Sequence, residues 1–162
     1  MITNYLSPIG FTVHVARLPN VEFFTQRATI PGVTMEPAAL ASPMSNLFAV
    51  GDRLQYQDLD ISFLVDENME NYAEAFNWME ALTSPENFDA YTPLENGEYG
   101  LSSDIKITVL NSNKNSNMVF TYLNCFPLSL SPINMDVTAT DITPPEVNMS
   151  FRYDRFKFER SP

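Results

Sequence analysis

The closing segment of the chain, "VNMSFRYDRFKFERSP" (147–162), constrains the fold most, because its apolar alternation changes phase. Its first apolar residues alternate as in a strand with one buried face: Val147, Met149, Phe151 and Tyr153. Phe156 and Phe158 have the opposite parity, so an unbroken strand would point them to the other face. Either a bulge near Asp154 restores one apolar face, or this strand buries both faces.

A second predicted strand, "NMVFTYLNCF" (117–126), raises the same question. Its apolar residues occupy both parities: Val119, Leu123 and Cys125 on one side, and Phe120, Tyr122 and Phe126 on the other. The chain shows only one clear helical pattern, which cannot cover every apolar β face. Some of these second faces are therefore expected to meet another sheet or another subunit.

The helical pattern covers about residues 67–83. It begins with acidic residues and Asn, which suit a helix N-terminus, and Pro85 follows its end. The predicted buried stripe has helical spacing: Tyr72, Ala75, Phe76, Met79 and Leu82. Trp78 lies off this stripe, so it either covers the rim of the sheet or forms an exposed anchor for a partner.

The rest of the chain is mostly β, and its length predicts one domain over 1–162. Residues 30–52 form a long connection, rich in Pro and small residues, with no sustained period. Compact domains seldom keep such a connection without a function, so we expect a binding arm. Leu47, Phe48 and Val50 have no periodic reason to be buried there, and we expect them to contact an adjacent subunit or ring.

Charge limits the function. The formal net charge is -11, which argues against a protein that grips nucleic acid by neutralising phosphates. Residues 54–105 hold 12 acidic side chains and no Lys or Arg, whereas cations gather near the C-terminus. This pattern indicates either a solvated acidic face or a surface that meets a basic one on a neighbouring copy.

Targeting and membrane signals are not found in the sequence. No apolar run approaches the ~18 residues of a membrane helix, and the first residues lack a signal-peptide pattern. We therefore expect a soluble chain that is made in the cytoplasm and does not insert into a membrane.

Catalytic motifs are scarce. The single His14 and the single Cys125 give few ways to build a nucleophile with a base, or a metal site. Both positions are explained by ordinary strand structure, and the carboxylates near Asp58 and Asp60 by alternation and helix capping. We expect no enzyme, no metal and no cofactor; an acidic-cleft enzyme or carbohydrate-binding module is the weaker alternative.

The order of the segments resembles the tail tube proteins of contractile-tailed bacteriophages, over residues 11–158. The phrases that carry the resemblance are, in order, "F-x-V-x-V", "LPNVEFF", "IPG", "GDRLQYQDLDISFLVDE", "NYAEAFNWMEAL", "SDIKITVLNSN", "FPLSLSPI" and "SFRYDRFKF". The resemblance implies a mainly β fold, a sandwich or barrel of two packed antiparallel sheets, with one flanking helix and a long extended arm.

The resemblance also implies a structural virion protein. Such subunits form hexameric rings whose inner sheets join into a β-barrel, and the rings stack into the tube through which the genome is ejected. The implied partners are further copies, the tail sheath, the baseplate or tube initiator, the tape-measure protein and transiently passing DNA. A tube initiator, another baseplate or tail ring protein, and a secretion- or injection-system tube subunit remain open as alternatives.

Two sets of residues follow from the tube interpretation. An acidic wall would repel phosphate and let DNA slide, and Asp58, Asp60 and Asp104 are candidates to face the bore. At the closing strand, we expect Phe156 and Phe158 to face away from Tyr153 and to press against the next copy, with Arg155 beside them. The competing account is a bulge at residues 154–155 that turns both rings into the core.

Overall fold

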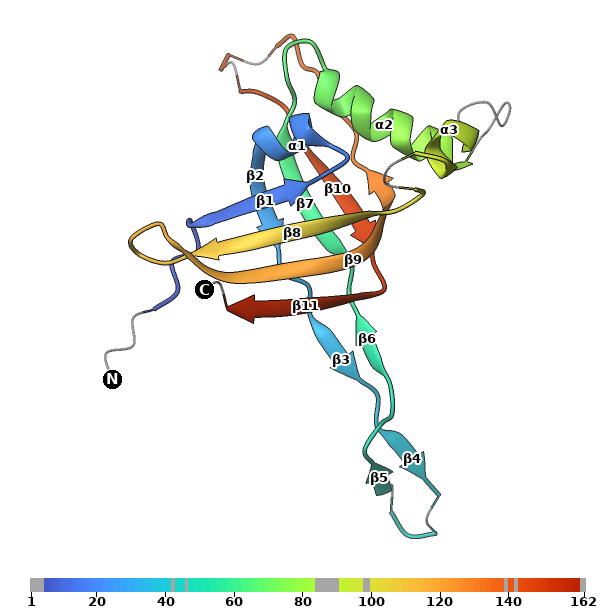
Figure 1. The fold of residues 1–162 in the computed structure, drawn as a ribbon. Helices are drawn as coiled ribbons and strands as arrows, with labels where there is room; N and C mark the ends of the chain where they lie inside the picture. Colours follow the sequence, from blue (N-terminus) through green and yellow to red (C-terminus); the bar gives the residue numbers. More distant parts are fainter. Residues whose placement is uncertain are drawn as a thin grey trace.

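The computed structural model describes residues 5–41, 43–45, 47–83, 91–97, 100–138, 140–141 and 143–160. Within them the chain is mainly β, as expected (Figure 1). The strands are β1 Phe11–Val15, β2 Thr25–Thr29, β3 Val33–Met35, β4 Ala38–Leu40, β5 Leu47–Ala49, β6 Leu54–Tyr56, β7 Leu59–Leu64, β8 Ser103–Leu110, β9 Ser116–Leu130, β10 Glu146–Arg152 and β11 Arg155–Arg160. The helices are α1 Pro19–Phe23, α2 Glu70–Thr83 and α3 Tyr91–Glu95.

The body of the protein is two layers of antiparallel strands joined by one long strand. The hydrogen-bonded path runs β1-β8-β9-β10-β7-β2, and β11 pairs with β9 beside this path. We call the layer of β1, β8, β9 and β11 sheet A, and the layer of β9, β10, β7 and β2 sheet B. Because β9 has 15 residues, it is long enough to belong to both layers.

The phase changes seen in the sequence occur at the corner where β9 passes from sheet A to sheet B. Asn124 has a left-handed backbone with φ 56°, and the nearest buried residues on either side of it, Tyr122 and Cys125, are three positions apart instead of two. The break between β10 and β11 lies beside it: Asp154 N donates to Leu123 O at 3.1 Å, and Asn124 Nδ2 donates to Asp154 Oδ2 at 2.6 Å. One corner therefore explains both anomalies.

The core lies between the two sheets. Sheet A contributes Val13, Val15, Ile105, Ile107 and Tyr122, and sheet B contributes Leu59, Ile61, Phe63, Val147, Met149 and Phe151. Each strand alternates as expected, because one face of each sheet is buried and the other is polar. The polar faces of sheets A and B consequently point away from each other.

Helix α2 lies across one end of the sandwich (Figure 1), and its buried face differs from the expected stripe. The buried residues are Asn71, Ala75, Trp78 and Ala81, while Phe76 is 50% exposed. Asn71 is buried because its side chain satisfies backbone groups: Nδ2 donates to Leu64 O at 2.7 Å, and Oδ1 accepts from Asp66 N at 3.3 Å. Pro85, expected to end this helix, lies outside the described residues.

Two further helices were not expected. Helix α1 has Pro in its first turn, where the missing N–H is not needed, and it separates β1 from β2 so that these strands enter different sheets. The short helix α3 follows the undescribed residues 84–90. The prediction of only one helix was therefore wrong, although the class, mainly β with a flanking helix, was confirmed.

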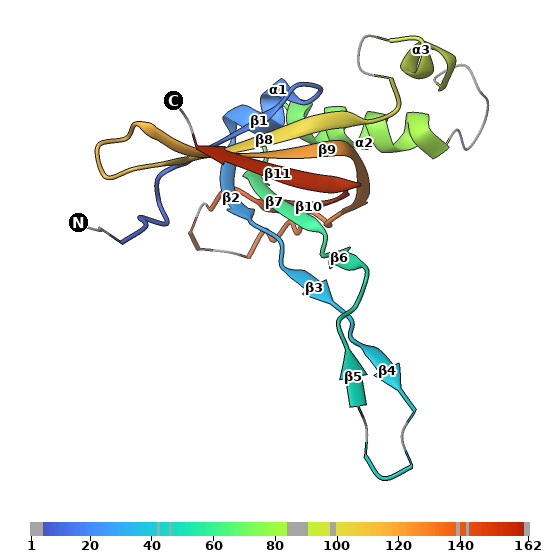
Figure 2. The same ribbon diagram turned by 60° about the horizontal axis from the view of Figure 1, so that its bottom comes forward.

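The arm leaves the opposite end of the sandwich from α2 and projects away from it (Figure 2). It is a two-stranded antiparallel ribbon in two sections, β3 with β6 and β4 with β5. It therefore contains the expected segment 30–52 and extends through β6 to Tyr56. Its root is held to the body by Tyr56, whose ring lies 5.8 Å from Tyr153 and 5.7 Å from Phe156.

Candidate functional site

The arm offers an exposed apolar surface. On and after β5, Leu47 is 51% exposed, Phe48 is 65% exposed and Val50 is 84% exposed. The side chains on the paired strands are also exposed, so the ribbon has no buried face of its own. The contact of these three residues with a neighbouring subunit stays a prediction.

Gly51 permits the close approach of the two halves of the arm. A Cβ at this position would lie 1.9 Å from the carbonyl oxygen of Glu36. This point lies between the two paired sections, where the two halves of the arm cross (Figure 2). Only a residue without a side chain fits here without displacing the backbone.

The closing strand provides a second surface, and its structure corrects the expectation for Phe156. That ring is half-buried and lies 5.5 Å from Tyr122 and 6.3 Å from Tyr153, so it does not face away from the core. The competing account, a break at residues 154–155, is right for Phe156. Phe158, which shares its face, is 63% exposed because the core below it ends. Arg155 lies on the opposite, polar face of sheet A.

Trp78 is not an exposed anchor. Its side chain is 3% exposed, its ring lies 6.2 Å from Phe151, and its Nε1 donates to Leu101 O at 3.3 Å. The guanidinium of Arg17 lies 5.2 Å from the ring centroid. The alternative that Trp78 covers the rim of the sheet is therefore correct, because the indole fills the end of the core under α2.

The three acidic candidates for the bore do not share a surface. Asp104 is on the polar face of sheet A, where its Oδ1 accepts from Asn124 N at 3.0 Å. Asp58 and Asp60 belong to the outer side of sheet B: Asp58 pairs with Arg152 at 3.0 Å, and Asp60 accepts from the hydroxyl of Ser150. If one face lines a channel, these carboxylates cannot all lie in it.

The polar face of sheet A carries charges of both signs. Its exposed cations are Lys106, Arg155 and Lys157, and its exposed carboxylates are Asp104 and Glu159. This face is close to charge balance although the whole chain has a net charge of -11. Most of the acidic excess must therefore lie elsewhere on the molecule.

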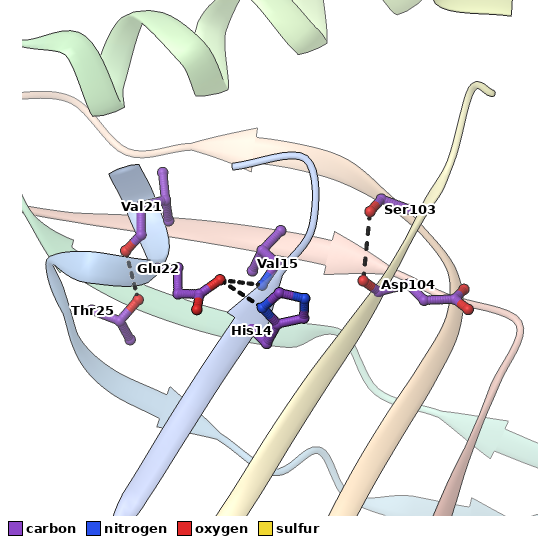
Figure 3. A network of polar contacts seen from close by, with 7 residues as sticks. All are labelled: His14, Val15, Val21, Glu22, Thr25, Ser103 and Asp104. Atoms are coloured by element: carbon purple, nitrogen blue, oxygen red, sulfur yellow. Dashed lines mark hydrogen bonds and ion pairs between the residues drawn. The ribbon is translucent and has the colours of Figure 1, made fainter. Parts of the chain in front are cut away.

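His14 takes part in a small polar network at the edge of sheet A (Figure 3). Its Nδ1 lies 2.9 Å from Glu22 Oε2, and the same oxygen accepts from Val15 N at 3.2 Å. Among the described residues, no group of three or more His, Cys, Asp or Glu side chains is arranged to hold a metal ion. The network thus joins α1 to β1.

Cys125 is a buried thiol in the corner of β9. Burial raises its pKa from 9.0 to about 12, so the thiol stays protonated and unreactive near neutral pH. In the described part of the chain, no helix is long and apolar enough to cross a bilayer.

Sequence reasoning named residues of β11 at one edge of sheet A, but it missed the residues at the other edge, beside β1. Each edge strand, β1 and β11, has one partner in the described structure. Beside β1, Ile9 and Phe23 are 89% and 80% exposed and border a hollow of about 410 Å³. The adjacent aromatic residues in "VEFF" were a signal, since only one of the pair, Phe24, packs against the core.

Solved structures with the same fold come from contractile injection systems. The chain aligns with a protein of the anti-feeding prophage baseplate at TM-score 0.66 and 14% identity, covering 98% of this chain and 97% of that one. It aligns with the tube-terminating cap of the same particle at TM-score 0.62 and 14% identity, covering 99% and 95%. A protein of the PVC sheath-tube complex aligns at TM-score 0.58 and 15% identity, covering 97% and 93%.

Sequence comparison gives the family. Among curated protein sequences, none matches the chain significantly. The family model described as "Phage tail tube protein" matches residues 2–159, which is nearly the whole chain. The resemblance noted in the sequence is therefore confirmed: this chain belongs to the phage tail tube protein family and is a structural subunit of a tail tube, not an enzyme.

Proposed function

We propose that copies of this chain form hexameric rings that stack into the inner tube of a contractile tail. The observation that supports this most directly is that, in the described part of the chain, the outermost strands of sheet A, β1 and β11, each pair on one side only. A sheet with two available edges can join identical sheets on both sides, and a ring removes every edge. The single domain of residues 1–162 is the repeating unit.

The strand directions agree with ring closure. Each neighbouring pair in the order β1-β8-β9-β11 is antiparallel, so β1 and β11 run in opposite directions. When a rotation places β11 of one copy beside β1 of the next, the new pair is also antiparallel. The joined sheets then form one antiparallel barrel with the polar face of sheet A toward the axis and the core face outward.

The arm would join successive rings. It projects from the end of the sandwich opposite α2 (Figure 2). Its apolar side chains Leu47, Phe48 and Val50 are exposed. In a stack, Leu47, Phe48 and Val50 would pack on a neighbouring subunit. Replacing Phe48 with Ser should shorten or abolish tubes and leave the subunit folded; unchanged tube length would contradict the bridging role.

The bore would be nearly neutral. The polar face of sheet A has both cations and carboxylates, so Asp104 is the one of the three acidic candidates that fits a position in the channel wall. A wall without a strong positive field lets DNA, and the tape-measure protein before it, pass without tight binding. A gel shift with duplex DNA at low salt tests this, and tight, salt-sensitive binding would contradict it.

The remaining partners follow from this role. The sheath would surround the tube, and the baseplate or tube initiator would start it; the solved relatives include a sheath-tube complex and a baseplate. Assembly would occur in the cytoplasm of the bacterial host, before the tail becomes part of the virion.

Electron microscopy of the purified protein tests the proposal. We expect tubes or stacked rings with a central channel. Single rings that never lengthen would favour the second candidate, a tube initiator or terminator, for which the fold of the baseplate and cap relatives is equally suitable. Monomers at every concentration, with and without the tail's initiating complex, would contradict both.

A further inference from the structure

The hydrogen-bond phase of β1 determines which of its backbone groups are available. Leu110 N donates to Gly10 O at 2.8 Å, so Gly10 and Leu110 form a hydrogen-bonded pair. Pairs of this kind alternate along an antiparallel ladder. Phe11, Val13 and Val15 therefore point their N–H and C=O groups away from β8, toward the outer edge of sheet A.

Glu22 closes one end of that edge. Its carboxylate accepts the N–H of Val15 at 3.2 Å and also lies 2.9 Å from His14 Nδ1 (Figure 3). An incoming strand cannot use the N–H of Val15 without displacing this carboxylate. In the described structure β1 has β8 as its strand partner, so the outward groups of Phe11 and Val13 can pair with a further strand.

The backbone groups at the β11 edge alternate in a way that matches those of β1. Leu123 O accepts from Asp154 N, which shows that the backbone of Leu123 faces β11. By alternation, Arg155 and its successors of the same parity face β9, so the backbone groups of Phe156 and Phe158 point to the outer edge. The side chains of these two residues and of Phe11 and Val13 all lie on the core face. The two edges can therefore pair without a bulge.

The space beside β1 suits an aromatic ring. A hollow of about 410 Å³ lies there, lined in part by Ile9, Phe11, Val13 and Phe23. Phe158, on the opposite edge and the same face of the sheet, is 63% exposed. Charge is also complementary, since β11 carries three cations and one carboxylate, whereas Glu22 borders the hollow.

We propose that Phe158 of one copy fills the hollow beside β1 of the next copy. The backbone of β11 pairs with Phe11 and Val13, and Glu22 ends the ladder at Val15, which limits the register. This inference rests on the proposed ring and names its contact. The occupant is a second copy of this chain, because β11 supplies both the matching edge and the exposed ring.

Disulfide cross-linking tests the junction and reads its register. Thr12, Lys157 and Glu159 have side chains on the polar face, and their backbone groups point away from the proposed junction. Thr12 would therefore lie opposite Lys157 or Glu159 of the next copy in a non-hydrogen-bonded pair, with Cα atoms about 4.5 Å apart. We would make Thr12→Cys with Lys157→Cys, and separately Thr12→Cys with Glu159→Cys. On oxidation of the assembled protein, one of these two double variants should give a series of covalent multimers.

The controls separate this junction from the ring itself. Thr12→Cys with Phe158→Cys puts the thiols on opposite faces and should give no such series, and Thr12→Cys alone should give at most dimers. If microscopy shows rings but neither test pair gives covalent multimers, the proposed junction between β11 and β1 is wrong, while the proposed ring still stands. No rings under any condition would overturn the proposed function and this inference with it.

Truncation of the aromatic ring gives an independent measurement. Phe158→Ala should raise the protein concentration needed for assembly by about tenfold or more while the subunit stays folded. Phe23→Ala should have a similar effect, and the double variant should lose little more than either single change, because both remove one contact. Fully additive losses, or unchanged assembly of Phe158→Ala, would contradict the proposed contact.

Discussion

The body and the arm are both antiparallel β structure, but they are stabilised in different ways. In the body, strands such as β10 bury every second side chain completely between two sheets. In the arm, the strands have three residues each and no buried face. An isolated two-stranded ribbon is marginally stable in water. We therefore expect the exposed surface of the arm to be covered by a partner outside the chain, whereas the body is stabilised by its own core.

The largest expected difference in the free energy of unfolding is between variants that remove one phenylalanine from the body and one from the arm. Phe151 is fully buried and Phe48 is mostly exposed. Phe151→Ala should lower the free energy of unfolding by about 3–5 kcal/mol, because it leaves a cavity between the sheets. Phe48→Ala should change it by less than about 0.5 kcal/mol. Chemical denaturation of the unassembled subunits measures both, and equal losses would show that the arm also folds onto the body.

A smaller effect is expected at the end of the core under α2. Trp78→Phe removes the hydrogen bond to Leu101 O and weakens the contact with Arg17, which should lower the free energy of unfolding by about 1–2 kcal/mol. Phe76→Ala on the same helix is the control and should change it by less than about 0.5 kcal/mol. A larger loss of stability for Phe76→Ala than for Trp78→Phe would support the buried stripe of α2 that the sequence predicted.

That stripe illustrates what the sequence could predict and what it could not. Helical spacing allowed two adjacent buried faces, and hydrophobicity favoured the one with Phe76. The structure uses the face with Asn71, because this side chain satisfies the backbone of the turn that follows β7. A buried polar residue that supports a turn cannot be recognised from apolar periodicity.

The strands of the body were predictable for a physical reason that does not apply to the edges. Alternation records burial on one face, so β7, β8 and β10 could be identified from residues such as Ile61, Ile107 and Met149. The phase changes indicated a corner without locating its partner strand. Which strands end as edges depends on tertiary pairing, and the surface that we propose for assembly at β1 therefore left little signal beyond the exposed Phe23.

Alkaline pH should destabilise the body through buried acids. Burial raises the pKa of Cys125 from 9.0 to about 12, and burial raises the pKa of Tyr153 from 10.0 to about 12. In the unfolded chain these groups ionise at their ordinary values, so above about pH 9 the folded state binds more protons. Stability should then fall as pH rises from about 9 toward 12 and should be flat below that range with respect to these groups.

Denaturation midpoints measured across this range test the pH effect. Cys125→Ala should reduce the slope, because one of the buried acids is removed. A thiol reagent should also fail to modify Cys125 in the folded protein near neutral pH. A stability that rises between pH 9 and 11, or rapid modification of the native thiol, would show that this corner is open to solvent.

The smallest effect on the body is expected from Gly51→Ala, and it is the sharpest test of the comparison. The added methyl group would lie 1.9 Å from the carbonyl oxygen of Glu36, so the two halves of the arm must separate or change their twist. Because the atoms nearest to this methyl group belong to Glu36 and Met35, which are not core residues, the free energy of unfolding should change by less than about 0.5 kcal/mol. The arm would no longer present Phe48 in the same place, and tubes should shorten or fail to form.

Ala39→Ser, an equally small change at an exposed position of the arm, is the control and should leave tube length unchanged. A loss of subunit stability in Gly51→Ala would mean that the arm and the body unfold as one unit, and normal tubes would mean that stacking does not depend on the arm's geometry.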